Sequence, residues 1–107
     1  MIKFKYTLNN SLAELARGTL SNYFGNSIIG YMDEGDVNNL RHMSLYLMCE
    51  IIVDETTGNK TYQNAIGVVA KNDYQAVGMY NEINNSDNGS VLCEIENRCD
   101  ELKVEPL

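Results

Sequence analysis

The fold is decided by residues 44–83, which read SLYLMCEIIVD (44–54), ETTGN (55–59), KTYQNAIGVVAK (60–71) and NDYQAVGMYNEI (72–83). The first and third segments have the length and the alternation of apolar side chains that are typical of β-strands. The segment between them is rich in turn-forming residues, with Gly58 as the expected positive-φ position. The fourth opens with the spacing of a helix-capping box, from Asn72 to Gln75. The stretch therefore predicts a β-hairpin followed by a helix.

The two faces of the first hairpin strand differ in polarity. One face is apolar throughout and is predicted to face the core; it carries Leu45, Leu47, Cys49, Ile51 and Val53. The other face is only partly polar, which indicates either a central strand or a strand that meets a partner; it carries Tyr46, Met48, Glu50, Ile52 and Asp54. In the return strand, Gly67 is a candidate for a β-bulge or for a close backbone approach.

Three further elements flank this unit. Alternation predicts a strand over residues 2–8 and another over 90–96, with Val91, Cys93 and Ile95 facing inward. Helical periodicity and a Ser11 cap predict a helix over residues 12–24. Residues 25–43 are predicted to form a long irregular connection with one short helix over 37–42, capped by Asp36. Within it, the apolar run 28–32 fits either a helical turn or a short extra strand.

The resulting order is β-α-β-β-α-β. It predicts an α+β fold with a four-stranded antiparallel sheet and two helices on one face, the split βαβ or ferredoxin-like arrangement. In that arrangement the first and third strands are central. We expect residues 1–107 to form a single domain with a loosely held acidic tail over about 98–107. Resemblance at the level of the fold carries no function.

The charge of the chain restricts its partners. Fifteen acidic and eight basic residues give a net charge of −7 and a pI of about 4.5. This balance argues against direct binding to nucleic acid or to an anionic membrane, because phosphate contacts need Lys or Arg. It permits a protein partner with a basic groove, while the simpler reading is that the acids provide solubility. The absence of an 18-residue apolar run and of a signal-peptide pattern leads us to expect a cytoplasmic protein.

No motif points to catalysis, a cofactor or a metal. Cys49, Cys93 and Cys99 form no CxxC pair, and His42 is the only histidine that could join them in a site. The acids around Gly35 do not match a calcium-binding loop and are better interpreted as a solvated loop. We therefore expect a protein that is not an enzyme and that carries no cofactor or metal.

Acidic residues and tyrosines are the candidate partner-binding groups. Carboxylates accept paired contacts from arginine as phosphates do, so a surface of carboxylates can imitate a nucleic-acid backbone. This requires that the hairpin tip, the loop before the hairpin and the last strand project in one direction. Tyrosine is enriched at protein interfaces. The candidate residues are Asp33, Glu34, Asp36, Tyr46, Asp54, Glu55, Glu94, Glu96, Asp100 and Glu101.

These observations favour a non-enzymatic protein that inhibits a partner by occupying its basic nucleic-acid-binding groove. Size, acidity and tyrosine content are similar to those of phage or mobile-element anti-defence proteins, of which anti-CRISPR proteins are one kind. No motif narrows this to a family. A second hypothesis is a homodimeric binder of a nucleotide signal, with Arg17, Arg41 or Lys71 around a pocket. A third is a module that dimerises through an open strand edge or through Tyr46, Met48 and Ile52.

Overall fold

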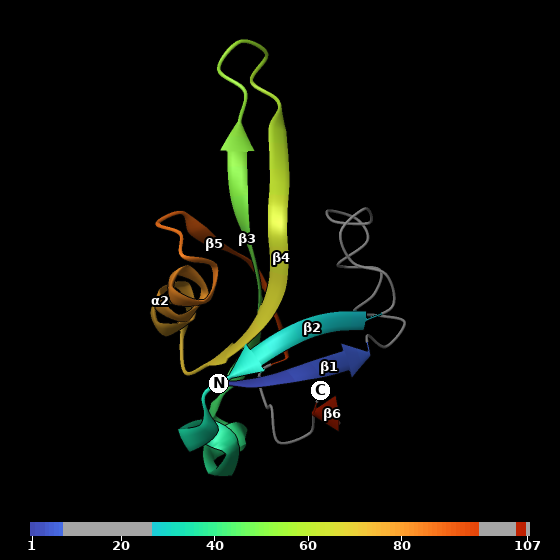
Figure 1. The fold of residues 1–107 in the computed structure, drawn as a ribbon, viewed down its shortest axis with the longest axis vertical. Coiled ribbons are helices and arrows are strands. Elements are labelled where there is room, and N and C mark those ends of the chain that lie inside the picture. Colours follow the sequence, from blue (N-terminus) through green and yellow to red (C-terminus); the bar gives the residue numbers. More distant parts are fainter. Residues whose placement is uncertain (8–26, 97–104, 107) are drawn as a thin grey trace.

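The structure is a computed structural model and describes residues 1–7, 27–96 and 105–106. It confirms the α+β class (Figure 1). In chain order the elements are β1 (Ile2–Thr7), β2 (Ser27–Met32), the 3-10 helix η1 (Glu34–His42), β3 (Ser44–Val53), β4 (Lys60–Ala70), α2 (Asp73–Asn84), β5 (Gly89–Glu96) and β6 (Glu105–Pro106). The helix predicted over residues 12–24 lies outside the described residues. Of the predicted tail, residues 105–106 are described, and they pair with β1.

The sheet differs from the predicted ferredoxin-like arrangement. Within the described residues it has six strands in the order β5-β3-β4-β2-β1-β6, and β2 runs parallel to β4, so the sheet is mixed. The prediction of four antiparallel strands was therefore wrong in detail. The first strand does not lie beside the hairpin, because β2 inserts between β1 and β4. The first hairpin strand, β3, is central instead, with β4 on one side and β5 on the other.

The inserted strand comes from the segment that was predicted to be irregular. Its buried positions alternate along β2, at Ile28, Gly30 and Met32, as they do in a half-buried strand. Gly30 lies opposite Phe4 of β1, and a Cβ atom at Gly30 would sit only 2.4 Å from the Phe4 ring. The glycine therefore makes room for the aromatic side chain, and the pairing of β1 with β2 depends on that fit.

The short helix that follows starts earlier than predicted. Asp33, not Asp36, is the N-cap of η1, and its Oδ1 accepts a hydrogen bond from the Gly35 amide at 3.1 Å. The helix ends before Met43, whose amide donates to the Leu40 carbonyl at 3.1 Å. Strand β3 therefore begins directly after η1, at the end of the molecule opposite the hairpin turn, which we call the base (Figure 1).

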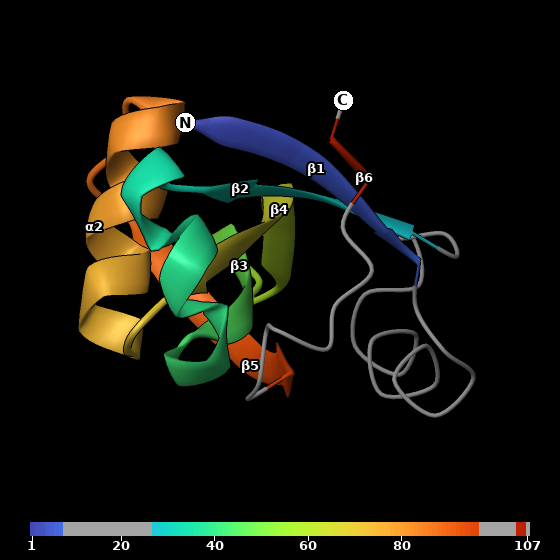
Figure 2. The same ribbon diagram turned by 90° about the horizontal axis from the view of Figure 1, so that it is seen from below.

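The first part of β3 is buried on both faces of the sheet. Side chains at Leu45 and Leu47 belong to one buried cluster, and those at Tyr46 and Met48 belong to another, so the two clusters lie on opposite faces of β3. Helix α2 covers the second cluster, packing Ala76, Met79 and Tyr80 against β3, β4 and β5. Figure 2 shows α2 on one side of these strands. The first cluster consists of Phe4, Tyr6, Ile28, Met32, Met43, Leu45, Leu47, Val69 and Ile95.

Helix α2 begins as its sequence predicts. The Asn72 side chain accepts from the Gln75 amide at 2.8 Å, and Gln75 Oε1 accepts in turn from the Lys71 amide at 2.7 Å. These bonds satisfy backbone donors that the first helical turn leaves open. The helix ends at Asn85, which takes the left-handed conformation at φ 49°.

The hairpin leaves the sheet at a β-bulge. Opposite Cys49 of β3, the return strand β4 places two residues, Asn64 and Ala65, and Asn64 has a φ of 53°. The bulge is thus three residues before Gly67. Gly67 is instead a point of close approach, where a Cβ atom would lie 3.1 Å from Ile28 and from Leu45. Beyond Glu50, which still pairs with Gly89 of β5, the two strands have no further described neighbour and project along the longest dimension of the molecule (Figure 1).

Candidate functional site

The predicted acidic residues do not form one surface. The hairpin tip (residues 54–59) and helix η1 lie at opposite ends of the molecule, whose longest dimension is 47 Å (Figure 1). The requirement that the tip and the loop project in one direction is therefore not met, because the chain runs from η1 into the start of β3 and only then out along the hairpin (Figure 1). Glu96 pairs through its backbone with Leu45, near the base. Asp100 and Glu101 lie outside the described residues.

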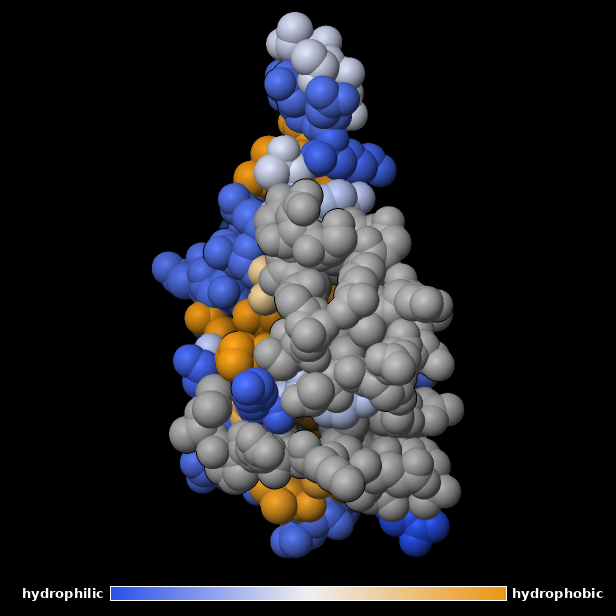
Figure 3. Space-filling model, turned by 90° about the vertical axis from the view of Figure 1, so that its right-hand side faces the viewer, coloured by the Kyte–Doolittle hydropathy of each residue, from blue (hydrophilic) through white to orange (hydrophobic). Residues whose placement is uncertain are grey.

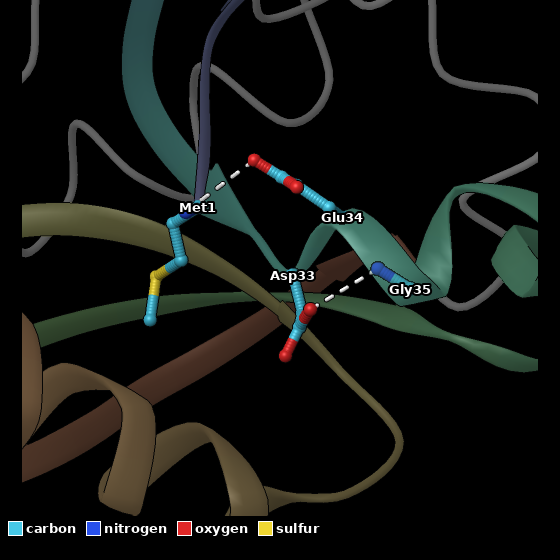
Figure 4. Close-up of polar contacts among 4 residues, drawn as sticks. All are labelled: Met1, Asp33, Glu34 and Gly35. Atoms are coloured by element: carbon cyan, nitrogen blue, oxygen red, sulfur yellow. Dashed lines mark hydrogen bonds and ion pairs between the residues drawn. The ribbon is translucent and has the colours of Figure 1, made fainter.

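The acids at the base are arranged around the start of η1 (Figure 4). Asp33 caps the helix, and Glu34, 77% exposed, lies 4.0 Å from the amino group of Met1. An exposed pair at this distance contributes little to stability. One carboxylate oxygen of Asp36, Oδ2, is buried and has no hydrogen-bond partner among the described residues. Asp33 and Glu34 thus have local partners, and both carboxylates remain exposed.

The tip of the hairpin is an ordered turn built around Asp54. Its Oδ1 accepts from the amides of Thr56 at 2.8 Å and Thr57 at 3.3 Å. Its backbone closes the loop, since the Asp54 amide donates to the Asn59 carbonyl and the Gly58 amide donates to the Asp54 carbonyl, both at 2.8 Å. Gly58 has a φ of 73°, as its sequence position predicts. The turn holds Glu55 exposed at the end of the molecule.

We call residues 50–63 the hairpin arm. In its outer part Ile51 pairs with Tyr62, Ile52 with Thr61 and Val53 with Lys60, and neither strand has a second neighbour among the described strands. Ile52 is 47% exposed and Val53 is 52% exposed, on opposite faces of the ribbon. Figure 3 shows hydrophobic surface directly below the polar tip.

An arm of this kind gains little stability from its own two strands. A two-stranded ribbon is marginally stable in water, and an open strand edge with apolar side chains invites pairing with another chain. The fold of the described residues therefore gives no reason for the exposure of Ile52 and Val53 in the outer arm. The predicted outward position of Ile52 is confirmed, whereas Val53, predicted to face the core, is exposed.

Tyr46 is not accessible, in contrast to its predicted role as a partner contact. It is 7% exposed and packs in the cluster beneath α2. Burial raises the pKa of its phenol, and the neighbouring Glu94 carboxylate raises that pKa further, whereas hydrogen bonding to Ser44 lowers it. Glu94 lies directly opposite Tyr46 across β3 and β5 and is exposed. The structure therefore brings together two predicted site residues, one buried and one at the surface.

A groove next to this pair was missed by the sequence reasoning. Its volume is about 350 Å³, and it is lined by Asp73, Tyr74 and Val77 of α2 and by Val91 of β5. We call it the α2–β5 groove. Tyr74 is 89% exposed, the most exposed of the large apolar or aromatic side chains among the described residues. Val91, predicted to face inward, packs with Val77 against the cluster beneath α2, and both are half-buried at the groove.

The described residues offer little for catalysis or metal binding. Among residues 1–7, 27–96 and 105–106, no three His, Cys, Asp or Glu side chains lie close enough together to hold a metal ion. Cys49 and Cys93 are free thiols. Burial, together with the charge of Glu50, raises the pKa of Cys49 to about 11, and burial raises the pKa of Cys93. A thiol with a raised pKa is a poor nucleophile, because the thiolate is the reactive form.

Comparison with known proteins adds no assignment, since no protein-family model, curated protein or solved structure matches this chain. No helix in the described ranges has both the length and the apolar character needed to cross a bilayer.

Proposed function

We propose that the chain is a non-enzymatic acidic binding protein that inserts its hairpin arm into a partner protein and inhibits it. The observation that carries this proposal is the arm itself, a projecting ribbon with exposed Ile52 and Val53 below a carboxylate-bearing tip. Apolar side chains ringed by polar ones form the energetic centre of many protein interfaces. Contact with a partner would bury both faces of the ribbon and supply the support that an isolated hairpin lacks.

The charge at the tip of the arm selects the kind of partner. Because Asp54 and Glu55 are exposed at the leading end of the arm, the partner is a protein with a basic groove of the kind that holds nucleic acid. Opposite charges steer the encounter and make it sensitive to salt. An arm in that groove would exclude the nucleic acid by competition. This is an inhibitory role in the cytoplasm of the kind that phage or mobile-element anti-defence proteins perform, and it needs no catalytic group.

The nucleotide-binding alternative draws less support from the geometry. It requires basic side chains around a pocket, whereas the α2–β5 groove carries Asp73 and no lysine or arginine among its lining residues. Arg41 lies in the last turn of η1 and Lys71 immediately precedes the cap of α2. Arg17 lies outside the described residues. A phosphate would be repelled at the groove rather than held.

The test starts with a pull-down from a bacterial lysate on immobilised protein at low and at high salt. The nucleic-acid binding of a salt-sensitive partner is then measured by fluorescence anisotropy with and without the protein. We expect wild-type protein to displace the nucleic acid, and Ile52→Thr with Val53→Thr to weaken this about tenfold or more, as loss of an interface centre does. Threonine keeps the strand propensity of both positions.

Charge is tested separately from apolar contact. Asp54→Asn with Glu55→Gln removes two charges from the tip, while asparagine can still accept the hydrogen bonds of the turn. The matched control, Asp33→Asn with Glu34→Gln, removes two charges from the opposite end. The tip pair should slow association more than the control pair. Equal effects of the two pairs, or a partner that still binds nucleic acid in saturating protein, would contradict the proposal.

A further inference from the structure

We infer that the α2–β5 groove binds an extended, basic segment of a protein, with one apolar and one arginine or lysine side chain of that segment pointing into it. This surface is separate from the hairpin arm and does not depend on the function proposed for the arm. Asp73, Tyr74, Val77 and Val91 line the groove. Glu94 lies on the same face of β5 as Val91, because their partners on β3, Tyr46 and Met48, belong to one cluster.

The apolar floor sets the first requirement on the occupant. Val77 and Val91 are both half-buried beside the cluster under α2, and they form the floor of a groove that is open to solvent. A volume of about 350 Å³ is larger than one apolar side chain needs and is at the small end of sites that enclose whole ligands. Insertion of a single valine- or leucine-sized side chain would therefore remove this floor from water while leaving the groove partly open.

The rim sets the second requirement. Asp73 and Glu94 are exposed carboxylates on the α2 side of β5, and their charges act together on the phenol of Tyr46. Neither forms an ion pair within the described part of the chain, although Lys71 lies two residues before Asp73. Tyr74 stands 89% exposed beside them. A guanidinium or ammonium group placed here would meet two carboxylates and the face of an aromatic ring.

The strand at the groove sets the third requirement. Among the described strands β5 is the end of the sheet and pairs only with β3, so no described strand occupies its other edge. An extended segment can add to such an edge, and its alternate side chains then point to the same face. Val91 and Glu94 are three residues apart, but the bulge between them places them opposite Met48 and Tyr46, which are two residues apart on β3. An apolar and a basic residue two positions apart on an added strand would therefore lie near Val91 and Glu94. The occupant that satisfies all three requirements has the pattern apolar-x-basic.

The test is a titration of ¹⁵N-labelled protein with the peptide Thr-Val-Thr-Arg-Thr-Val-Thr-Arg, followed by amide chemical shifts. We expect saturable shifts confined to residues 73–77 and 89–94. The counterpart with glutamate in place of arginine should not bind, because its charge is repelled by Asp73 and Glu94. Saturable shifts at the hairpin arm instead of the groove, absence of saturation, or equal binding of the acidic peptide would overturn the inference.

Variants separate the groove from general acidity. Tyr74→Ala should weaken the arginine peptide about threefold, the effect of one exposed cation–π contact. Asp73→Asn with Glu94→Gln should weaken it further and remove most of its salt dependence. The control is Glu82→Gln, an exposed acid on the side of α2 away from Asp73. If the control weakens binding as much as the paired groove variant does, the peptide is responding to net charge alone and the inference fails.

Discussion

The hydroxyl of Tyr80 donates a hydrogen bond of 2.7 Å to the backbone carbonyl of Asn64. This bond links helix α2 to the bulge from which the hairpin arm departs. Tyr80 is fully buried, and burial raises the pKa of its phenol well above the ordinary value, with further contributions from Glu50 and Cys49. The phenol is therefore a permanent neutral donor. It donates to the carbonyl of a residue that has no register partner on β3, and it ties the start of the arm to α2.

Replacing Tyr80 with phenylalanine tests this link. The change removes only the hydroxyl and leaves the Asn64 carbonyl without its donor, so we expect the free energy of unfolding to fall by about 1 to 2 kcal/mol. Urea unfolding followed by circular dichroism measures this. Tyr74→Phe is the matched control, because Tyr74 is 89% exposed and its change should be close to neutral. Equal stability of the Tyr80 and Tyr74 variants would argue against a structural role of the bond.

A second prediction concerns the fit of Gly30 against Phe4. A Cβ atom at Gly30 would approach the Phe4 ring to 2.4 Å, so Gly30→Ala should destabilise the protein by about 1 to 3 kcal/mol. Gly78→Ala is the opposite case. Nothing lies within 4 Å of a Cβ atom there, and the residue is inside α2, so alanine should add about 0.5 to 1 kcal/mol. The midpoint of thermal unfolding should thus fall for Gly30→Ala and rise for Gly78→Ala. Shifts in the same direction would contradict the difference in space around the two glycines.

A third prediction concerns thiol reactivity. With its pKa raised to about 11, Cys49 is about one part in a thousand thiolate at pH 8, and its side chain is fully buried. In a variant that keeps only this cysteine (Cys93→Ser with Cys99→Ser), reaction with a disulfide reagent at pH 8 should be limited by opening of the fold. Added urea should accelerate it steeply. A rate equal to that of a small free thiol, already without urea, would mean that Cys49 is accessible.

A fourth prediction concerns the pH dependence of stability near the base of the arm. The Gln63 side chain donates to Glu50 Oε2 at 2.8 Å, and this bond is the main reason that the pKa of Glu50 is lowered. A carboxyl group whose pKa falls on folding stabilises the fold above its unfolded pKa of about 4.5 and loses that effect as the pH drops through its folded pKa. Stability should therefore decrease on the acid side of pH 4.5.

Two variants isolate that contribution. The difference in unfolding free energy between wild type and Glu50→Gln should be largest near pH 7 and shrink as the pH falls below about 4. In a Gln63→Ala background the same difference should depend less on pH, because the principal donor is gone. Urea unfolding at a series of pH values provides the measurement. A difference that grows toward acid would mean that folding raises the pKa of Glu50.

Local signals in the sequence predicted the local structure well. The two hairpin strands, the positive φ of Gly58 and the Asn72 cap depend on neighbouring residues, and all are confirmed. The predicted core face of the first strand is confirmed only in part, because β3 is buried on both faces at its start and Val53 is exposed. Strand β2 depends instead on Phe4 and on a parallel partner in β4, far away in the chain. Its short apolar run fits several structures until those partners are known.

For the candidate site too, the sequence predicted local properties and missed those that depend on residues far apart in the chain. Sequence identified Glu94 and Glu55 as exposed acids, and both are exposed. It did not separate Tyr46 from the accessible tyrosines, because the mixed face of β3 fits equally well under a helix and against a partner. It also did not place the acids relative to one another, since the inserted strand and the bulge decide which end of the molecule each group occupies. The groove was missed because it arises from two elements that meet only in the folded chain.

The distance between the acidic ends has an electrostatic consequence. The molecule is 47 Å long, whereas the screening length of water at 0.1 M salt is about 10 Å. The tip carboxylates and those of η1 therefore do not influence each other at that ionic strength. A partner bound at one end experiences the few charges found there and not the net charge of −7. Dilution of the salt below about 0.01 M would extend the screening length to about 30 Å, so the chain would begin to act as a single polyanion only under those conditions.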